Sequence, residues 1–394
     1  MAAFLDDVSQ VLSRFARPSI RLLWKTHSSF WVLGATGFVL AVCLGVTLGR
    51  SAGRTAWPIL AVAAGAAGTF LALVAAAKAI TGEERLTFYH HQIAVLIVAW
   101  VILRLADLPI LPYLDITILG IGLFAAIGRV GCLMVGCCYG RPHRWGVRYG
   151  SDHADLGFPA PLVGVPLFPV QIAESLALVG IVAAGAVLIT GSAPPGSALE
   201  WFIVSYAGVR FGLEFLRGDP GRPFVLGFSE AQWTSVLLLS SVVAAESIGL
   251  LPRQNWHAVA CASLLMTLVL VALGRHLWRP WSHVLRPLHL VEVAQAVVML
   301  REGETKDSWS TRSTLGRNID VATTPMGIQI SAGDIRARGV TIHHFAVSTR
   351  RGPMPRSEAG ALARVIATLI EAGASYELVG GHRGVFHFIM PHSE

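Results

Sequence analysis

The chain has 394 residues, of which 54% are hydrophobic and only 14% are charged, and its formal net charge is +7. Charged residues make up about a quarter of an ordinary soluble protein, so this composition excludes that class and indicates a multi-pass membrane protein. The charge is uneven: residues 1–286 hold 20 Lys and Arg against 14 Asp and Glu, whereas residues 287–394 hold 11 against 10. We therefore expect a membrane body followed by a nearly neutral soluble part, with no nucleic-acid partner.

Residues 1–29 lack the apolar stretch of about 7–15 residues and the small-residue cleavage site of a signal peptide. We expect no cleaved leader here. The segment instead combines apolar and basic side chains, as in an amphipathic helix on a lipid surface or in a plain solvated helix. These side chains are Val8, Val11, Leu12, Phe15, Arg14, Arg17, Arg21 and Lys25.

Eight segments are candidates for membrane-spanning helices, which need about 20 mostly apolar residues. They cover approximately residues 30–48, 57–80, 90–105, 115–138, 167–190, 197–216, 230–250 and 256–278. The third segment is short. We predict an all-α polytopic membrane protein with seven or eight transmembrane helices over residues 30–286, and we read residues 141–165, rich in Gly, Pro and charge, as a structured loop.

From residue 287 the pattern changes to that of a small α+β soluble domain extending to residue 394. Periodicity predicts two helices, two strands and a hairpin, with a polar loop after the first helix. In order these are a helix over 288–300, a loop over 301–318, strands at 326–330 and 341–348, a helix over 357–371 and a hairpin over 376–390. We expect its histidines to be surface or hairpin residues rather than metal ligands: His343, His344, His382 and His387.

The polar residues of the membrane body fall on one membrane side, because successive spanning helices reverse direction. They are Tyr89, His90, His91, Arg129, Cys132, Cys137, Cys138, Gln171, Glu174, Arg210, Glu214, Arg217, Glu230 and Gln232. Several arginines around one polar cavity suit an anionic head group. The alternative for Arg210 and Glu214, four residues apart, is a structural ion pair.

Individual residues leave several roles open. Arg129 follows an uncharged run, where an ionisable group is usually retained for function. His90 and His91 are natural proton acceptors or interfacial residues. The three cysteines near Arg129 could line the cavity, form a metal or redox cluster, or act as reactive thiols. We assign no metal and no cofactor, because the Cys-x4-Cys-Cys spacing on one helix directs neighbouring thiols to different faces.

Four landmarks in the chain resemble the prolipoprotein diacylglyceryl transferase family, over about 200 residues between the second and seventh segments. Gly128–Gly131 is similar to its Gly-Arg-x-Gly signature, and Phe168–Glu174 to its His-Pro-x-Gln-x-x-Glu motif. Tyr206–Asp219 resembles Tyr-x-x-x-Arg-x-x-x-Glu-x-x-Arg-x-x-Asp, and Ser229–Gln232 resembles Ser-x-x-Gln. The order and the segment ends also match.

The chain also departs from the family pattern, as a divergent member would. In the first signature Ile127 replaces a His, Cys132 and Val135 replace two Asn, and Cys137 replaces a Glu. The family's Phe-His-Gly-Gly corresponds to Phe-Tyr-His-His at residues 88–91, so strict alignment makes Tyr89 the base and a one-residue shift makes it His90.

The resemblance implies transfer of a diacylglyceryl group from phosphatidylglycerol, or a similar anionic phospholipid, to the cysteine thiol of a lipobox-bearing preprolipoprotein. It implies catalytic roles for Tyr89, His90, Arg129, Arg210 and Glu214. It implies substrate-binding roles for His91, Cys132, Cys137, Gln171, Glu174, Arg217 and Gln232. The alternatives are a phospholipid-dependent transferase with another acceptor, including a cysteine relay, and a lipid-binding or transport protein.

The resemblance places the protein in the bacterial plasma membrane, with its active site on the extracytoplasmic side. The distribution of Lys and Arg argues for the opposite orientation, because the segment ends that carry the polar residues are also the more basic ones. We adopt the family orientation as the expectation.

Overall fold

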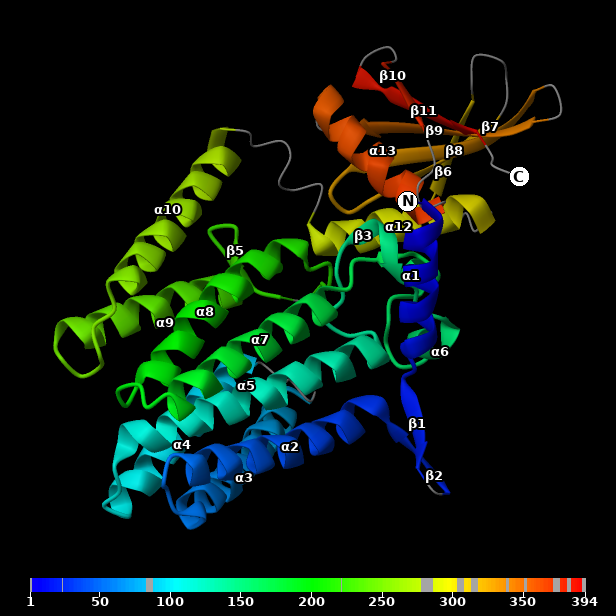
Figure 1. The fold of residues 1–394 in the computed structure, drawn as a ribbon. Helices are drawn as coiled ribbons and strands as arrows, with labels where there is room; N and C mark the ends of the chain where they lie inside the picture. Colours follow the sequence, from blue (N-terminus) through cyan, green and yellow to red (C-terminus); the bar gives the residue numbers. More distant parts are fainter. Residues whose placement is uncertain are drawn as a thin grey trace.

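A bundle of long helices lies beside a smaller domain in which helices pack on an antiparallel sheet (Figure 1). The computed structural model describes residues 2–22, 24–82, 88–220, 222–277, 286–302, 308–312, 318–337, 340–350, 353–370, 376–380 and 384–391. The predicted His382 lies outside these residues.

The bundle contains a helix at each of the eight predicted segments. These are α2 (Ser29–Ser51), α3 (Ala56–Thr81), α4 (Phe88–Leu105), α5 (Ile110–Val135), α7 (Val170–Thr190), α8 (Ser197–Leu213), α9 (Glu230–Ser247) and α10 (Asn255–Leu277). Among the described helices, α2, α3, α5, α7 and α10 are long and apolar enough to cross a membrane, and α4 is apolar but shorter. The predicted polytopic membrane protein is confirmed, with one correction: the fourth segment begins earlier, at Ile110, and ends earlier, at Val135.

Helix α5 is the central helix of the bundle. More than half of its most apolar window is buried (56%), against 17% for α3 and for α10. Glycines let its neighbours approach closely, as is common in membranes: a Cβ at Gly122 would lie 2.4 Å from the Phe202 ring, and one at Gly185 would lie 2.5 Å from Leu119. Near the start of α5, the Asp115 carboxylate accepts hydrogen bonds from the amides of Gly196 (2.7 Å) and Leu199 (2.8 Å). It thereby caps α8.

The N-terminal segment is only partly the predicted helix. Helix α1 spans Ala2–Phe15, and strands β1 (Ser19–Leu22) and β2 (Lys25–Ser28) then form a hairpin, so Arg21 and Lys25 lie in strands. The hydroxyls of Ser9 and Ser13 accept hydrogen bonds from the amides of Gly146 (3.1 Å) and Arg148 (3.0 Å). One face of α1 therefore packs on the connection that follows α5.

That connection is structured, as predicted. It contains β3 (Pro142–Val147), α6 (Ser151–Ala154) and the 3-10 turn η1 (Ala160–Leu162). Tyr149 and Leu167 are fully buried in its core. The His153 ring nitrogen Nε2 lies 3.0 Å from the carbonyl oxygen of Met134, which joins the connection to the last turn of α5.

Short elements also follow α8. They are the 3-10 turn η2 (Glu214–Leu216) and the strands β4 (Phe224–Val225) and β5 (Phe228–Ser229). The backbone after α5 pairs with the backbone after α8, because the amide of Arg141 donates to Leu216 and the amide of Gly218 donates to Tyr139. These bonds (3.0 and 2.9 Å) hold the two helix ends side by side.

In the part of the C-terminal domain that the structure describes, two helices accompany a six-stranded antiparallel sheet. Its elements are α12 (Pro287–Glu302), β6 (Ser308–Arg312), β7 (Asn318–Thr323), β8 (Ile328–Ala337), β9 (Val340–Thr349), α13 (Arg356–Ile370), β10 (Glu377–Gly380) and β11 (Phe386–Pro391). The strand order is β10-β11-β9-β8-β7-β6. The predicted α+β class is confirmed, but the expected loop over residues 301–318 contains β6, whose polar sequence has little apolar alternation to reveal it.

Two of the predicted histidines form a pair in this sheet. The rings of His344 and His387 stack with their centroids 5.2 Å apart, and Nε2 of the first lies 3.1 Å from Nδ1 of the second. Burial, together with the neighbouring His387, lowers the pKa of His344. The stacked rings therefore join β9 to β11.

Replacing Gly146 by Ala tests how firmly this connection is held. Gly146 has a φ of +149°, and a Cβ there would lie 1.9 Å from the carbonyl oxygen of Leu167, a backbone atom. We expect G146A to lose about 1–3 kcal/mol of stability, seen as a lower thermal unfolding midpoint of the detergent-solubilised protein. Gly180→Ala in α7 meets no atom within 4 Å and is the control. Equal midpoints for the two variants would contradict the prediction.

Candidate active site

The Glu174 carboxylate, near the start of α7, joins three helices. Its Oε2 lies 3.0 Å from Nε of Arg129 on α5 and 3.8 Å from Nη1 of Arg210 on α8. Its Oε1 accepts a 2.6 Å hydrogen bond from the Tyr206 hydroxyl. The side chains of Glu174, Arg210 and Arg129 are only 2%, 7% and 10% exposed. Three predicted site residues therefore meet in one buried ion-pair cluster.

The cluster continues beyond α8. Glu214 Oε2 lies 3.0 Å from Nη1 of Arg210 and 4.0 Å from Nη1 of Arg217, and Glu214 Oε1 contacts Arg222. Arg217 also donates two hydrogen bonds to Asp219, at 2.8 and 2.7 Å. The ion-pair ladder expected as an alternative is thus present, and it is continuous with Arg129 and Glu174.

The ion-pair cluster has more positive than negative charges, and one of its guanidinium nitrogens makes no hydrogen bond to the described residues. It contains four arginines and three carboxylates, hence one excess positive charge: Arg129, Arg210, Arg217, Arg222, Glu174, Glu214 and Asp219. Although Arg210 Nη1 lies 3.0 Å from Glu214 Oε2, neither atom has a hydrogen-bond partner among the described residues. The guanidinium of Arg210 therefore keeps donor capacity for another oxygen.

The three predicted cysteines converge beside this cluster. Helix α5 ends at Val135, because Gly136 adopts a left-handed conformation (φ 75°), and Cys138 is left-handed too (φ 54°). The sulfurs of Cys132, Cys137 and Cys138 consequently all lie within 4.8 Å of one another. The expectation that these thiols point to different faces is wrong, since it assumed a helix continuing through residue 138.

The positions of these thiols are electrostatically favourable for a thiolate. Hydrogen bonds from Cys132 and Cys137, together with the nearby positive charges of Arg217 and Arg129, hold the pKa of Cys138 well below its ordinary value. Hydrogen bonds with Cys132 and Cys138, together with burial, raise the pKa of Cys137. The cluster could hold a thiophilic metal ion.

Gln171 holds the cysteine segment in place. Its Nε2 donates to the carbonyl oxygen of Cys137 (2.9 Å) and to the Tyr149 hydroxyl (3.3 Å). Burial raises the pKa of Tyr149, so its hydroxyl stays neutral. Gln171 is therefore a link between α7, the end of α5 and the structured connection.

The three candidate bases occupy different environments. The Tyr89 hydroxyl is buried, 2.8 Å from the Ser235 hydroxyl, and its ring packs at 6.0 Å on that of Tyr206. His90 is 62% exposed, with Nε2 2.7 Å from Oε1 of Glu230, and the His91 ring lies 5.1 Å from that of Phe70. Only Tyr89 among them reaches the buried cluster through a described contact, whereas His90 has a carboxylate partner at the exposed end of α9.

Gln232 is occupied by a helix cap. Its Oε1 accepts a hydrogen bond from the Ser229 amide (3.0 Å), while the Ser229 hydroxyl accepts one from the amide of Gln232 (3.3 Å). Its Nε2 donates to the carbonyl oxygen of Phe211 (3.4 Å). This capping box, together with the bond to Phe211, joins α9 to the end of α8 next to Arg210. These described hydrogen bonds of Gln232, a predicted binding residue, are to Ser229 and Phe211 and not to the ion-pair cluster.

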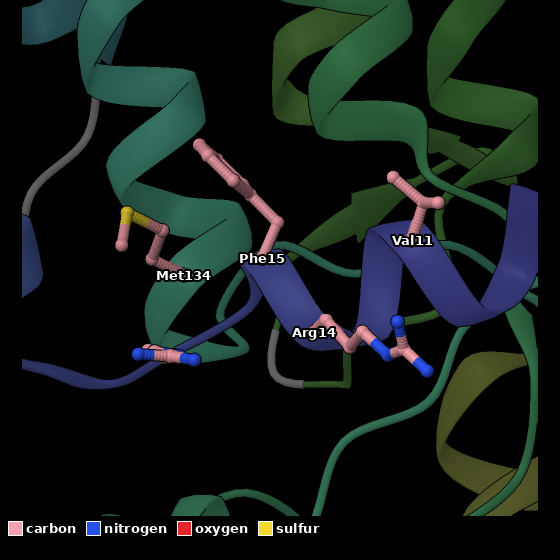
Figure 2. Close-up of a pocket in the computed structure, with 5 residues that line it drawn as sticks. Val11, Arg14, Phe15 and Met134 are labelled. Carbon is pink, nitrogen blue, oxygen red and sulfur yellow. The ribbon is translucent and has the colours of Figure 1, made fainter.

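A shallow apolar pocket lies outside the cluster, between α1 and the end of α5 (Figure 2). It is lined by Val11, Arg14, Phe15, Arg17 and Met134. None of the predicted site residues lines it. The predicted polar cavity around the arginines therefore stays a prediction.

Sequence reasoning gave no role to some residues of the site. Arg222 contacts Glu214 across a turn, and Ser235 contacts Tyr89 across the bundle; neither contact has a spacing signal in the chain. Tyr206, in contrast, lies four residues before Arg210, so helical periodicity places both on one face of α8. That signal could have identified Tyr206.

Comparison with protein families matches residues 33–246, more than half of the chain, to the family described as "Prolipoprotein diacylglyceryl transferase". The chain belongs to that family. The "Phosphatidylglycerol--prolipoprotein diacylglyceryl transferase" of Dehalococcoides mccartyi is 31% identical over 169 residues, which are 42% of this chain and 62% of that relative. "Phosphatidylglycerol--prolipoprotein diacylglyceryl transferase 2" of Clostridium perfringens is 33% identical over 146 residues, which are 36% of this chain and 50% of that relative. The chain thus matches less than two thirds of the length of these relatives.

Neutralising Glu174 tests whether the buried cluster holds this family member together. Glu174→Gln leaves Arg129 and Arg210 buried without their shared counter-charge, so we expect a loss of about 3–5 kcal/mol. The control is Glu230→Gln, which removes an exposed ion pair with His90 and should cost about 1 kcal/mol or less. Thermal unfolding of the two variants in the same detergent measures the difference. A Glu174→Gln midpoint equal to that of the control would contradict the prediction.

Proposed function

We propose that this protein transfers a diacylglyceryl group from phosphatidylglycerol to the cysteine thiol of a lipobox-bearing preprolipoprotein. Family membership and the names of its relatives support this reaction. The observation that carries it in this chain is the buried cluster around Glu174, in which arginines from two helices converge with one positive charge in excess. The phosphate diester of phosphatidylglycerol carries one negative charge and fits that excess.

In the proposed reaction the acceptor thiolate attacks a glycerol carbon of the phospholipid. The carbon–oxygen bond to phosphate breaks, and glycerol phosphate leaves with the bonding electrons. Fixed cations stabilise the charge that develops on the phosphate. Arg129 and Arg210 supply these donors, and Glu174 and Glu214 orient them. Arg217 is held by Asp219 and supports the outer side of the site.

The acceptor thiol needs a base, because its ordinary pKa is about 8.5. His90 suits this role better than the other two candidates, since Glu230 at 2.7 Å orients its imidazole. Tyr89 then acts by positioning the Tyr206 ring that contacts Glu174. His91, Cys132, Cys137, Gln171 and Gln232 shape the site around the substrates.

A cysteine relay within the protein is a weaker alternative. Attack by Cys138 on the phospholipid would form a thioether, and a thioether sulfur is a poor leaving group for a second displacement. Such a product would block the enzyme instead of passing the lipid on. The convergence of the three thiols therefore argues for a role other than covalent transfer.

Conservative arginine variants test the proposed function. Arg129→Lys and Arg210→Lys keep the charge but lose the forked donors, and we expect the transfer rate to fall about 100-fold or more. Transfer of labelled lipid from phosphatidylglycerol to a lipobox peptide measures that rate. Arg104→Lys, exposed at the end of α4, is the control. If both variants kept the control's rate, the proposed phosphate site would be wrong.

We further propose a location in the bacterial plasma membrane, with the site and the C-terminal domain on the extracytoplasmic side. The domain contacts the connection after α5 through α12 and α13, so both lie on the side of the cysteine cluster. In Arg364→Cys, on an exposed position of α13, we expect labelling by a membrane-impermeant maleimide in intact cells, above the wild-type background. Labelling that requires permeabilised cells would reverse the orientation.

A further inference from the structure

Three thiols lie within 4.8 Å of one another, beside the buried arginine cluster, and none of them takes part in the bond changes described so far. We propose that Cys132, Cys137 and Cys138 bind one Zn²⁺ ion, and that the acceptor thiol occupies the fourth position on this ion. This inference rests on the proposed function. It assigns the three cysteines to activation of the acceptor.

The geometry of the cluster suits zinc. Zinc–sulfur bonds are about 2.3 Å long, so tetrahedral coordination separates two sulfurs by about 3.8 Å, within the spread of the three thiols. The helix end makes this possible, because the turn at Gly136 brings Cys137 and Cys138 back towards Cys132. Gln171 fixes the carbonyl of Cys137 and thereby the position of its side chain.

The donor set and its surroundings also favour this ion. Thiolates select zinc or Cu(I) over magnesium, calcium and manganese. Cys132 is buried, whereas Cys137 and Cys138 are partly exposed. The solvent-exposed side of the three-cysteine site is therefore at Cys137 and Cys138, which follow the end of α5.

Three protein ligands leave one position for a substrate, as in catalytic zinc sites. A thiol that binds there would be deprotonated by the metal, and its proton would pass to water. The bound sulfur then donates an electron pair to the glycerol carbon, the carbon–oxygen bond to phosphate breaks, and glycerol phosphate leaves on Arg129 and Arg210. The thioether product is uncharged and binds zinc weakly, so it can depart.

The test uses the full-length protein, purified in detergent under reducing conditions. Elemental analysis should find about one zinc per chain in the wild type. Cobalt substitution should give thiolate-to-metal charge-transfer absorption. Both signals should be lost in Cys132→Ser and Cys138→Ser and retained in Cys43→Ser and Cys261→Ser, the matched controls, whose cysteines lie outside the cluster. A wild type without bound zinc, or zinc equally retained by all four variants, would overturn the site.

A second measurement tests whether the acceptor thiol occupies the fourth position on the metal ion. A lipobox peptide should change the visible absorption of the cobalt protein, whereas the same peptide with serine in place of cysteine should not. An unchanged spectrum, or a zinc-free wild type that transfers lipid at the full rate, would overturn thiol activation while leaving the proposed transferase function standing. Zinc binding in a protein that transfers no lipid from phosphatidylglycerol would instead count against the transferase function.

Discussion

The carboxylate of Glu174 is the contact on which the arrangement of the helices depends. An isolated charge inside an apolar bundle costs several kcal/mol, so Glu174, Arg129 and Arg210 are stable there only together. Because the three residues come from α7, α5 and α8, their contacts fix how these helices lie against each other. Tyr206 adds a hydrogen bond to the same carboxylate and aligns the face of α8 that carries Arg210.

The positions at which α5 and α8 end determine which residues surround Glu174. The left-handed turn at Gly136 stops α5 and starts the cysteine segment, and the 3-10 turn after α8 leads to Arg217. Backbone hydrogen bonds between these two segments, from Arg141 to Leu216 and from Gly218 to Tyr139, bring the thiols and the outer arginine together. The site is thus built at helix ends, where the backbone is no longer committed to helical hydrogen bonds.

The sequence predicts the helices well because a membrane span is defined by length and apolarity alone. Reversal of successive helices also places Arg129, Glu174 and Arg210 at one end of the bundle without further information. What it could not predict are contacts set by irregular backbone. The convergence of Cys132 with Cys138 depends on positive φ angles, and the ion pair of Arg222 with Glu214 depends on a turn. The strand β6 was missed for a different reason, because its five residues include a single apolar one, Trp309, and so show no apolar alternation.

Helix α5 carries one charge near each end, Asp115 and Arg129, and both are held by neighbouring helices. At about 1.5 Å per residue, the 26-residue helix is about 39 Å long and the two charges are about 21 Å apart. The hydrocarbon layer of a typical bilayer is about 30 Å thick. The two charges are therefore too close together for both to lie outside that layer, and Glu174 holds Arg129 inside the bundle. The span between the two charges is therefore bridged by the apolar middle of α5 alone, and each charge is balanced from a neighbouring helix and not by water.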